Sequence, residues 1–132
     1  MRYLDNDYLI NFIVTSGDPQ FQEDYTSSFQ NVDFFLMFYD ITNKKSFEKS
    51  KQKFLEIKKY LFRYKDKTPN IFFVGNKSDL KNREVKPADV ETFCKKYNIE
   101  SFEISVKTNS NMIKIINKCL GTFDDMARNV DL

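Results

Sequence analysis

Residues 71–79, Ile71-Phe72-Phe73-Val74-Gly75-Asn76-Lys77-Ser78-Asp79, decide how this chain folds. They begin with an uninterrupted run of aromatic and β-branched side chains, which is typical of a strand buried on both faces of a parallel sheet. Polar residues begin at Asn76, so a loop follows at the carboxyl end of the strand. Open parallel sheets bind ligands at such loops. The stretch therefore predicts both a central strand and a candidate binding site.

The patterns on either side predict an α/β fold. The expected strands are 8–15, 34–39, 70–75 and 102–105, and the expected helices are 45–64, 87–97 and 112–126. Asn43 suits the N-cap of the first helix, and Pro87 suits the first position of the second. Strands that alternate with helices predict a mostly parallel sheet with helices on both faces.

The N-terminal third is less regular. A turn at 5–7 would join a short antiparallel strand to 8–15, and the polar residues 16–29 predict a loop. Phe34, Phe35 and Phe38 belong to a solid apolar run, and we expect all three in the core.

Composition bounds the function. The 132 residues fit one domain, and 21 basic against 19 acidic residues leave a net charge of +2, which argues against a dedicated nucleic-acid binder. The chain contains no histidine, and Cys94 and Cys119 are far apart, so we expect no zinc site and two reduced thiols. We also expect no direct membrane anchor, because no long apolar run and no C-terminal cysteine are present.

Glycine is scarce. The three glycines, Gly17, Gly75 and Gly121, are widely separated. A loop that cradles phosphate needs closely spaced glycines so that backbone N–H groups can approach the anion. The sequence contains no such loop.

The tetrapeptide Asn76-Lys77-Ser78-Asp79 has the chemistry needed to recognise guanine. A carboxylate at Asp79 can accept two parallel hydrogen bonds from the ring N–H and the exocyclic amine of guanine, a pair that adenine does not present. The aliphatic stem of Lys77 can cover a purine face, and the amide of Asn76 can join neighbouring loops. Because a bare tetrapeptide of this kind occurs by chance, a second motif is needed.

That second motif is Ser105-Val106-Lys107-Thr108, which follows the next expected strand. Together with Tyr39-Asp40-Ile41-Thr42 and Ser46-Phe47-Glu48, it resembles the Ras-superfamily small GTPases, and the Rab branch most closely. The resemblance extends from about Tyr8 to the final helix. It implies a small-GTPase fold of the P-loop NTPase type. It also implies a guanine-nucleotide site that uses Asn76, Lys77, Asp79, Ser105, Val106 and Lys107, with Val106 where the family has alanine.

The chain also departs from the family pattern. It begins after the region that holds the P-loop and the first switch, and we therefore expect residues 1–132 to be a single incomplete small-GTPase-like domain. In the second switch motif, aligned on Gly17, Val14 replaces the metal-site aspartate and Asp18 replaces the glutamine. Val14 cannot hold the water shell of a metal, and Asp18 would repel the γ-phosphate. We expect no catalytic residue and no Mg²⁺ site.

These features predict a Rab-like small GTP-binding protein of vesicle traffic whose affinity for GTP or GDP is weak or absent. Alternatives are a catalytically inactive pseudo-GTPase that acts as a protein-binding module, and a non-functional remnant. Partners would be Rab-type effectors or regulators, and the expected location is the cytoplasm, peripheral to endomembranes. Phe21, Tyr25 and Phe29 could contact a partner or pack in the core.

Two further expectations concern the surface. Without a first strand, 8–15 and 34–39 would each expose unpaired backbone groups, so the chain is either a fragment or its strands rearrange or find a partner.

The lysines between Lys44 and Lys59 could suggest an anionic membrane or RNA surface. They alternate with Glu48 and Glu56, which favours an ordinary solvated helix face.

Overall fold

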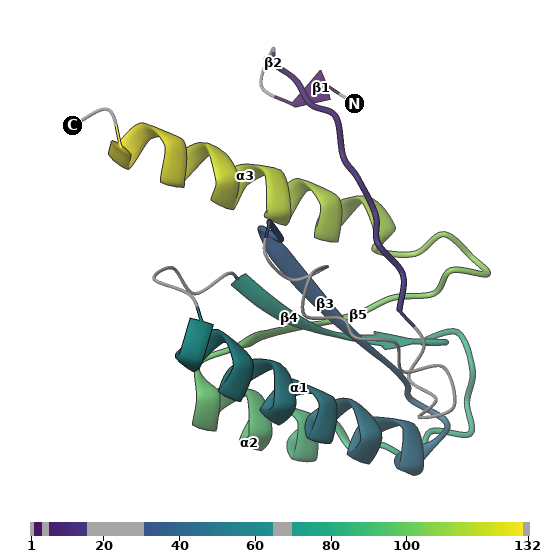
Figure 1. The fold of residues 1–132 in the computed structure, drawn as a ribbon. Coiled ribbons are helices and arrows are strands. Elements are labelled where there is room, and N and C mark those ends of the chain that lie inside the picture. The colour runs from purple at the N-terminus through teal and green to yellow at the C-terminus, as the bar shows by residue number, and fades with distance from the viewer. Residues whose placement is uncertain (1, 4–5, 16–30, 65–69, 131–132) are drawn as a thin grey trace.

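The computed structural model describes residues 2–3, 6–15, 31–64 and 70–130. A three-stranded parallel sheet lies at the centre, in the order β3-β4-β5. Its strands are β3 (Phe34–Asp40), β4 (Asn70–Asn76) and β5 (Glu100–Glu103). Helices α1 (Lys44–Tyr64) and α2 (Pro87–Tyr97) cover one face, and α3 (Met112–Val130) lies on the other (Figure 1). The predicted α/β architecture, a parallel sheet with helices on both faces, is confirmed.

The helix boundaries follow from local chemistry. Asn43 caps α1, because its side-chain oxygen accepts a hydrogen bond of 3.1 Å from the backbone N–H of Ser46. Pro87 occupies the first turn of α2 as predicted, and Asn98 ends that helix in the left-handed conformation with φ 54°. The predicted helix limits are correct to within one residue for α1 and agree for α2.

The core has two parts of unequal size. The larger part lies between the sheet and α1 and α2, where the rings of Phe47, Phe54, Phe73 and Phe93 meet at centroid distances of 5.3–6.3 Å. The smaller part, under α3, has Val74, Ile104 and Ile115 as its buried members. Most ring contacts among the described residues therefore lie on the α1–α2 face of the sheet, and Phe72 contacts Phe34 and Phe102 on the other face.

The prediction that all of Phe34, Phe35 and Phe38 lie in the core is wrong in part. Phe35 is buried, Phe34 is half-buried, and Phe38 is 52% exposed. Alternate side chains of a strand point to opposite faces of a sheet. Phe35 faces the well-filled α1–α2 side, whereas Phe34 and Phe38 face the more sparsely covered side.

The predicted strand at 8–15 is also wrong. These residues have no regular structure, and the side chains of Leu9 and Val14 are 89% and 92% exposed. The antiparallel pair lies earlier, between β1 (Arg2–Tyr3) and β2 (Asn6–Asp7), so Asn6 and Asp7 belong to a strand. A β-branched run forms a strand only where a neighbour pairs with its backbone, and β1-β2 and β3-β4-β5 are the only ladders among the described residues.

The last strand is displaced from its predicted place. The ladder with β4 pairs Phe72 with Glu100 and Gly75 with Glu103, so β5 ends before the predicted limit of residue 105. Ser105 instead begins the following loop and forms an isolated antiparallel bridge with Ser110.

The predicted loop at 16–29, with Gly17, Asp18, Phe21, Tyr25 and Phe29, lies outside the described residues.

Candidate functional site

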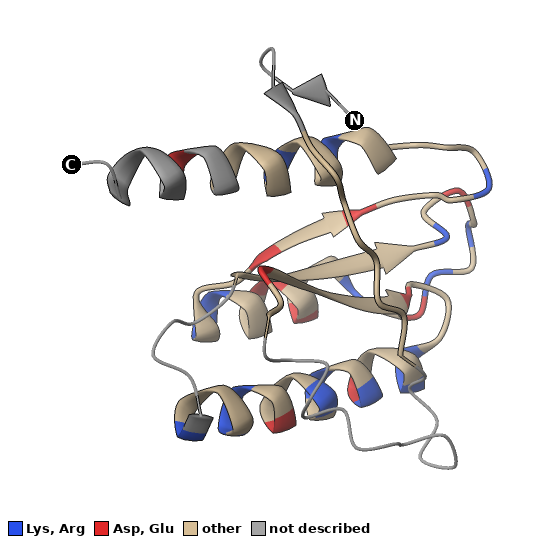
Figure 2. Cartoon of the chain, turned by 45° about the horizontal axis from the view of Figure 1, so that its top comes forward, with Lys and Arg blue, Asp and Glu red and all other residues tan. Residues whose placement is uncertain are grey.

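The candidate site is built at the carboxyl edge of the parallel sheet. Three loops meet there: residues 40–43, which include the last residue of β3, residues 77–80 after β4 and residues 104–110 after β5. Charged residues of both signs lie along the chain at this edge (Figure 2). Parallel strands end on the same side of a sheet, which brings together motifs separated by about 60 residues of sequence.

Asn76 joins all three loops. Its backbone oxygen accepts a hydrogen bond of 3.2 Å from the N–H of Ile41, and its side-chain oxygen accepts one of 3.2 Å from the N–H of Val106. The N–H of Ser78 donates to Ile104 at 3.0 Å, which closes the gap between the second and third loops. The amide of Asn76 thus has the joining role that its chemistry predicts.

Lys77 is held by the loop after β3. Its backbone adopts the left-handed conformation with φ 66°, and its ammonium lies 2.6 Å from Oδ2 of Asp40. The other oxygen of Asp40 accepts hydrogen bonds from the backbone N–H of Thr42 at 2.8 Å and from its hydroxyl at 2.7 Å. Asp40 is thereby fixed on one oxygen and binds the lysine with the other.

The environment of Asp40 favours its charged form. Burial alone would raise the pKa of its carboxyl, but the hydrogen bonds from Lys77 and Thr42 outweigh that effect and hold the pKa below its usual value. Asp40 therefore stays ionised, and Lys77 keeps its partner, at neutral pH. Asp40 belongs to a motif that marks the family resemblance, but the sequence did not indicate that it would contact Lys77.

Asp79 is oriented by Ser105. The hydroxyl of Ser105 donates to Oδ1 of Asp79 at 2.6 Å and accepts a hydrogen bond of 3.1 Å from the N–H of Thr108. Ser105 is fully buried whereas Asp79 is exposed, so a rigid hydroxyl holds an accessible carboxylate. A carboxylate offers about four lone-pair positions, and the bond from Ser105 leaves most of them for a ligand.

The remaining predicted residues lie at the rim or outside the described chain. Val106 is 55% exposed and is tied to Asn76 through its backbone, and Lys107 is exposed. Gly17 and Asp18 fall among the residues that the structure does not describe. In the described part of the chain, no three His, Cys, Asp or Glu side chains form a group that could hold a metal ion.

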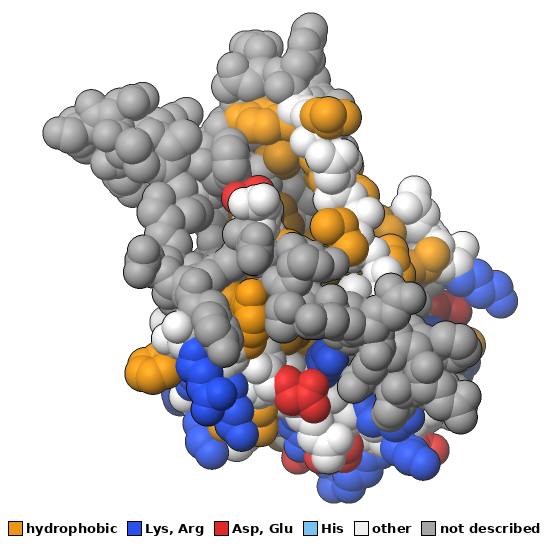
Figure 3. Space-filling view, viewed as in Figure 1, with side chains coloured by type: hydrophobic (Ala, Val, Ile, Leu, Met, Phe, Trp, Pro, Cys, Tyr) orange, Lys and Arg blue, Asp and Glu red, His pale blue; other side chains and the backbone are white. Residues whose placement is uncertain are grey.

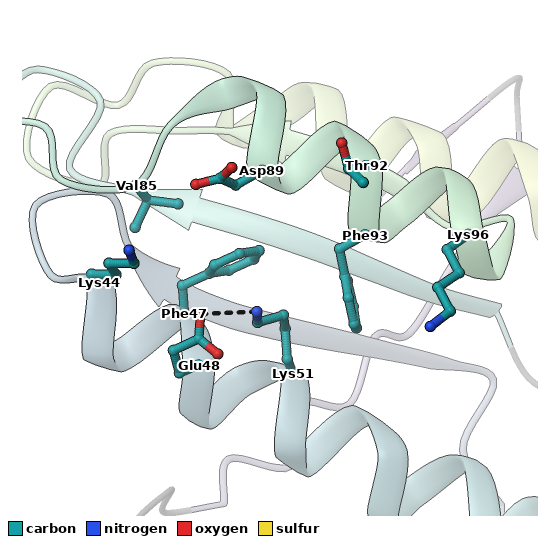
Figure 4. Close-up of a pocket in the computed structure, with 9 residues that line it drawn as sticks. All are labelled: Lys44, Phe47, Glu48, Lys51, Val85, Asp89, Thr92, Phe93 and Lys96. Carbon is teal, nitrogen blue, oxygen red and sulfur yellow. Dashed lines mark ion pairs between the residues drawn. The ribbon is translucent and has the colours of Figure 1, made fainter.

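A groove of about 370 Å³ lies elsewhere, between α1 and α2. The rings of Phe47 and Phe93 form its floor (Figure 4), and the ammonium of Lys51 lies 4.9 and 5.7 Å from their centroids. Lys51 also pairs with Glu48 at 2.8 Å. Because its central cation already has an internal partner, and none of the residues proposed to contact guanine lines it, this groove is a weaker candidate than the sheet edge.

Comparison with known proteins shows the family to which this chain belongs. A sequence model of the Ras family matches residues 1–125, and the chain belongs to this family. Ras-related protein Rab-27A of Canis lupus familiaris is 31% identical over 107 residues, which are 80% of this chain and 47% of the relative. Rab-37 of Homo sapiens is 31% identical over 99 residues, 74% of this chain and 43% of the relative.

Rab-27B of Bos taurus gives a similar result, with 30% identity over 111 residues, 80% of this chain and 48% of the relative. Within the Ras family, the chain is therefore similar to Rab members. It spans about half the length of the curated relatives that it matches.

Proposed function

We propose that the three loops at the sheet edge form a guanine-recognition half-site and that this chain acts as a Rab-like GTP-binding protein. Asp79 reads the base, Ser105 orients Asp79, and the stem of Lys77 covers one purine face. Asn76, Val106 and Lys107 complete the loops around it. The observation that carries this proposal is the 2.6 Å hydrogen bond between Ser105 and Asp79, which fixes an exposed carboxylate at the sheet edge.

The chemistry favours guanine over adenine. Guanine offers two adjacent donors to a carboxylate, and a hydrogen bond to a charged group contributes about 1.5–3 kcal/mol. Adenine presents an acceptor at the corresponding ring nitrogen, so it would leave Asp79 unpaired. A site with such a requirement rejects the wrong base strongly.

Affinity for GTP or GDP is expected to be weak in residues 1–132. The proposed contacts of Asp79 and Lys77 involve the base alone, and each tenfold change in affinity corresponds to about 1.4 kcal/mol. Without charge-assisted contacts to the phosphates, the affinity for GTP or GDP falls by several powers of ten. We propose that residues 1–132 by themselves neither bind Mg²⁺ nor hydrolyse GTP.

A titration with fluorescent GDP tests the half-site. We expect guanine nucleotides to displace the probe better than adenine nucleotides, and Asp79→Ala to remove this preference. Asp79→Asn should shift the preference toward xanthine, because an amide N–H₂ can donate to the carbonyl that xanthine carries in place of the guanine amine. Equal displacement by guanine and adenine nucleotides in the unmutated chain would contradict the proposal.

A catalytically inactive pseudo-GTPase that binds other proteins is the second candidate. One observation favours it: Val14, at the position that aligns with the metal-site aspartate of the family, is 92% exposed and has no polar atom in its side chain. Magnesium-dependent GTP hydrolysis by the purified chain, lost in Asp79→Ala, would exclude this candidate. Retained guanine preference without hydrolysis would support it.

We also propose a role in vesicle traffic with Rab-type effectors or regulators as partners, and a location in the cytoplasm at the surface of endomembranes. The Rab names of the relatives support this role. None of the helices in the described residues is long and apolar enough to cross a membrane.

A further inference from the structure

Helix α1 concentrates the positive charge of the protein. It carries seven lysines and one arginine against two glutamates, a net charge of +6 in a chain whose total is +2. The rest of the chain therefore has a net charge of −4. The inner face of α1 is filled by Phe47, Phe54, Ile57 and Leu61, each no more than 4% exposed, so the cations lie on its outer face and flanks.

The two glutamates of α1 neutralise only its two half-buried lysines. Glu48 pairs with Lys51 at 2.8 Å, and Glu56 pairs with Lys53 at 3.2 Å. Among the described residues, the charged groups of the exposed cations form no ion pair, although the backbone N–H of Lys44 donates to Glu84 at 3.1 Å and the ammonium of Lys58 lies 4.6 Å from the ring centroid of Tyr97. These exposed cations are Lys44, Lys45, Lys49, Lys58, Lys59 and Arg63.

An aromatic side chain protrudes among these cations. Phe62 is 91% exposed, next to Arg63 and one turn after Lys58 and Lys59. Leu55, two turns earlier, is 38% exposed. Figure 3 shows basic side chains gathered at the lower part of the molecule, where α1 lies, with an exposed hydrophobic side chain beside them.

We propose that the outer surface of α1 docks on anionic lipid membranes. We call this surface the α1 basic face and define it as Lys45, Lys49, Lys58, Lys59, Phe62 and Arg63. The cations attract the negative headgroups, and Phe62 enters the boundary between the headgroups and the acyl chains. This inference does not depend on nucleotide binding, because none of these residues belongs to the sheet edge.

The composition of the face favours lipid over protein or RNA. Interfaces between proteins are depleted in lysine and enriched in arginine, whereas α1 has seven lysines and one arginine. Flexible lysines carry point charges that suit mobile headgroups better than fixed acceptors. RNA binding normally needs a more basic domain than one with pI 8.4, together with aromatic side chains arranged for base stacking. Among the described side chains of this helix, Phe62 is the one strongly exposed aromatic residue.

The absence of tryptophan in the chain allows a direct test. Phe62→Trp places one fluorophore on the face without disturbing the core, because the side chain at this position is 91% exposed. We expect its emission to shift to shorter wavelength with vesicles of phosphatidylcholine and phosphatidylserine, and not with phosphatidylcholine alone. The apparent affinity should fall as salt is added, because salt screens exposed charges.

Charge reversal provides the matched control. In the Phe62→Trp background, Lys58→Glu, Lys59→Glu and Arg63→Glu together should weaken binding to the anionic vesicles by at least about tenfold. Lys81→Glu, Lys95→Glu and Lys114→Glu change the net charge equally at exposed positions elsewhere and should have a much smaller effect. Circular dichroism checks that both triple variants are folded.

Three outcomes would overturn the proposal. The first is no spectral shift, or an equal shift with neutral vesicles. The second is an equal loss of binding in the two triple variants, which would indicate attraction to net charge and not to this face. The third is binding to polyuridylate without binding to anionic vesicles, which would make α1 an RNA-binding surface.

Discussion

At the scale of single residues, the site depends on side chains that hold other side chains. Asp40 fixes the ammonium of Lys77, and Ser105 fixes the carboxylate of Asp79. In both pairs the partner comes from a different loop, so each holding residue also fastens two loops together. A substitution at Asp40 or Ser105 should therefore affect the stability of the protein as well as the binding of any ligand.

The pH dependence of stability should reveal the role of Asp40. The pKa of its carboxyl is lowered in the folded chain, whereas an unfolded aspartate has a pKa of about 3.9. Its contribution is therefore present above pH of about 3.9 and is lost as the pH falls through the lower, folded pKa. Asp40→Asn should destabilise the protein by about 1–2 kcal/mol at neutral pH and should reduce the loss in acid.

Urea unfolding measured from neutral to acidic pH checks this prediction. Asp33→Asn provides a comparison at an exposed aspartate just before β3. If Asp40→Asn and the unmutated chain lose stability in parallel as the pH falls, the link between Asp40 and Lys77 contributes nothing to the folded state.

At the scale of elements, the contact between β3 and β4 explains why a glycine precedes Asn76. Gly75 lies opposite Tyr39 in the parallel ladder. A Cβ atom built on Gly75 would lie 2.7 Å from the hydroxyl oxygen of Tyr39 and 2.8 Å from its Cζ. The ring of Tyr39 thus occupies the space that any other residue at position 75 would need.

Gly75→Ala should destabilise the protein by about 1–3 kcal/mol through overpacking. The hydroxyl of Tyr39 is buried and has no hydrogen-bond partner among the described residues, so Tyr39→Phe should cost little stability or even stabilise the protein. Combined with Gly75→Ala, Tyr39→Phe should restore part of the loss by removing the closest atom. Thermal unfolding of the two single variants and the double variant measures the coupling, and strictly additive effects would contradict the contact.

Sequence patterns located most elements because the determinants of these elements are local. Pro87, the cap at Asn43 and the apolar run of β4 each act within a few residues, and the structure agrees with all three. The strand predicted at 8–15 is absent because a strand depends on a neighbour that local patterns do not specify. The exposure of Phe38 has a similar cause, since the cover over each sheet face is set by distant elements.

At the scale of the whole molecule, the two sheet faces are covered unequally. Among the described residues, β3 pairs with β4 on one side only, and Leu9, Phe12, Val14 and Phe38 are 52–92% exposed. An unpaired strand edge near exposed apolar side chains can associate with other chains. We therefore expect the isolated chain to self-associate.

Sedimentation velocity over a range of protein concentrations tests this expectation. Phe38→Lys should shift the distribution toward monomer, because a charge on an edge strand opposes pairing between chains. Ile113→Lys changes a similarly exposed residue on α3 and should have less effect. A concentration-independent monomer with a reversible thermal transition would refute the prediction.

The sequence by itself determined the family, the parallel α/β sheet and most of the residues at the sheet edge, because these features follow from short motifs and from periodicity within single elements. Tertiary structure alone decided that Asp40 holds Lys77, that Phe38 is exposed and that the two glutamates of α1 neutralise only its half-buried lysines. Each of these facts depends on where side chains from neighbouring turns or separate elements come to lie in three dimensions. Sequence spacing alone does not fix those positions.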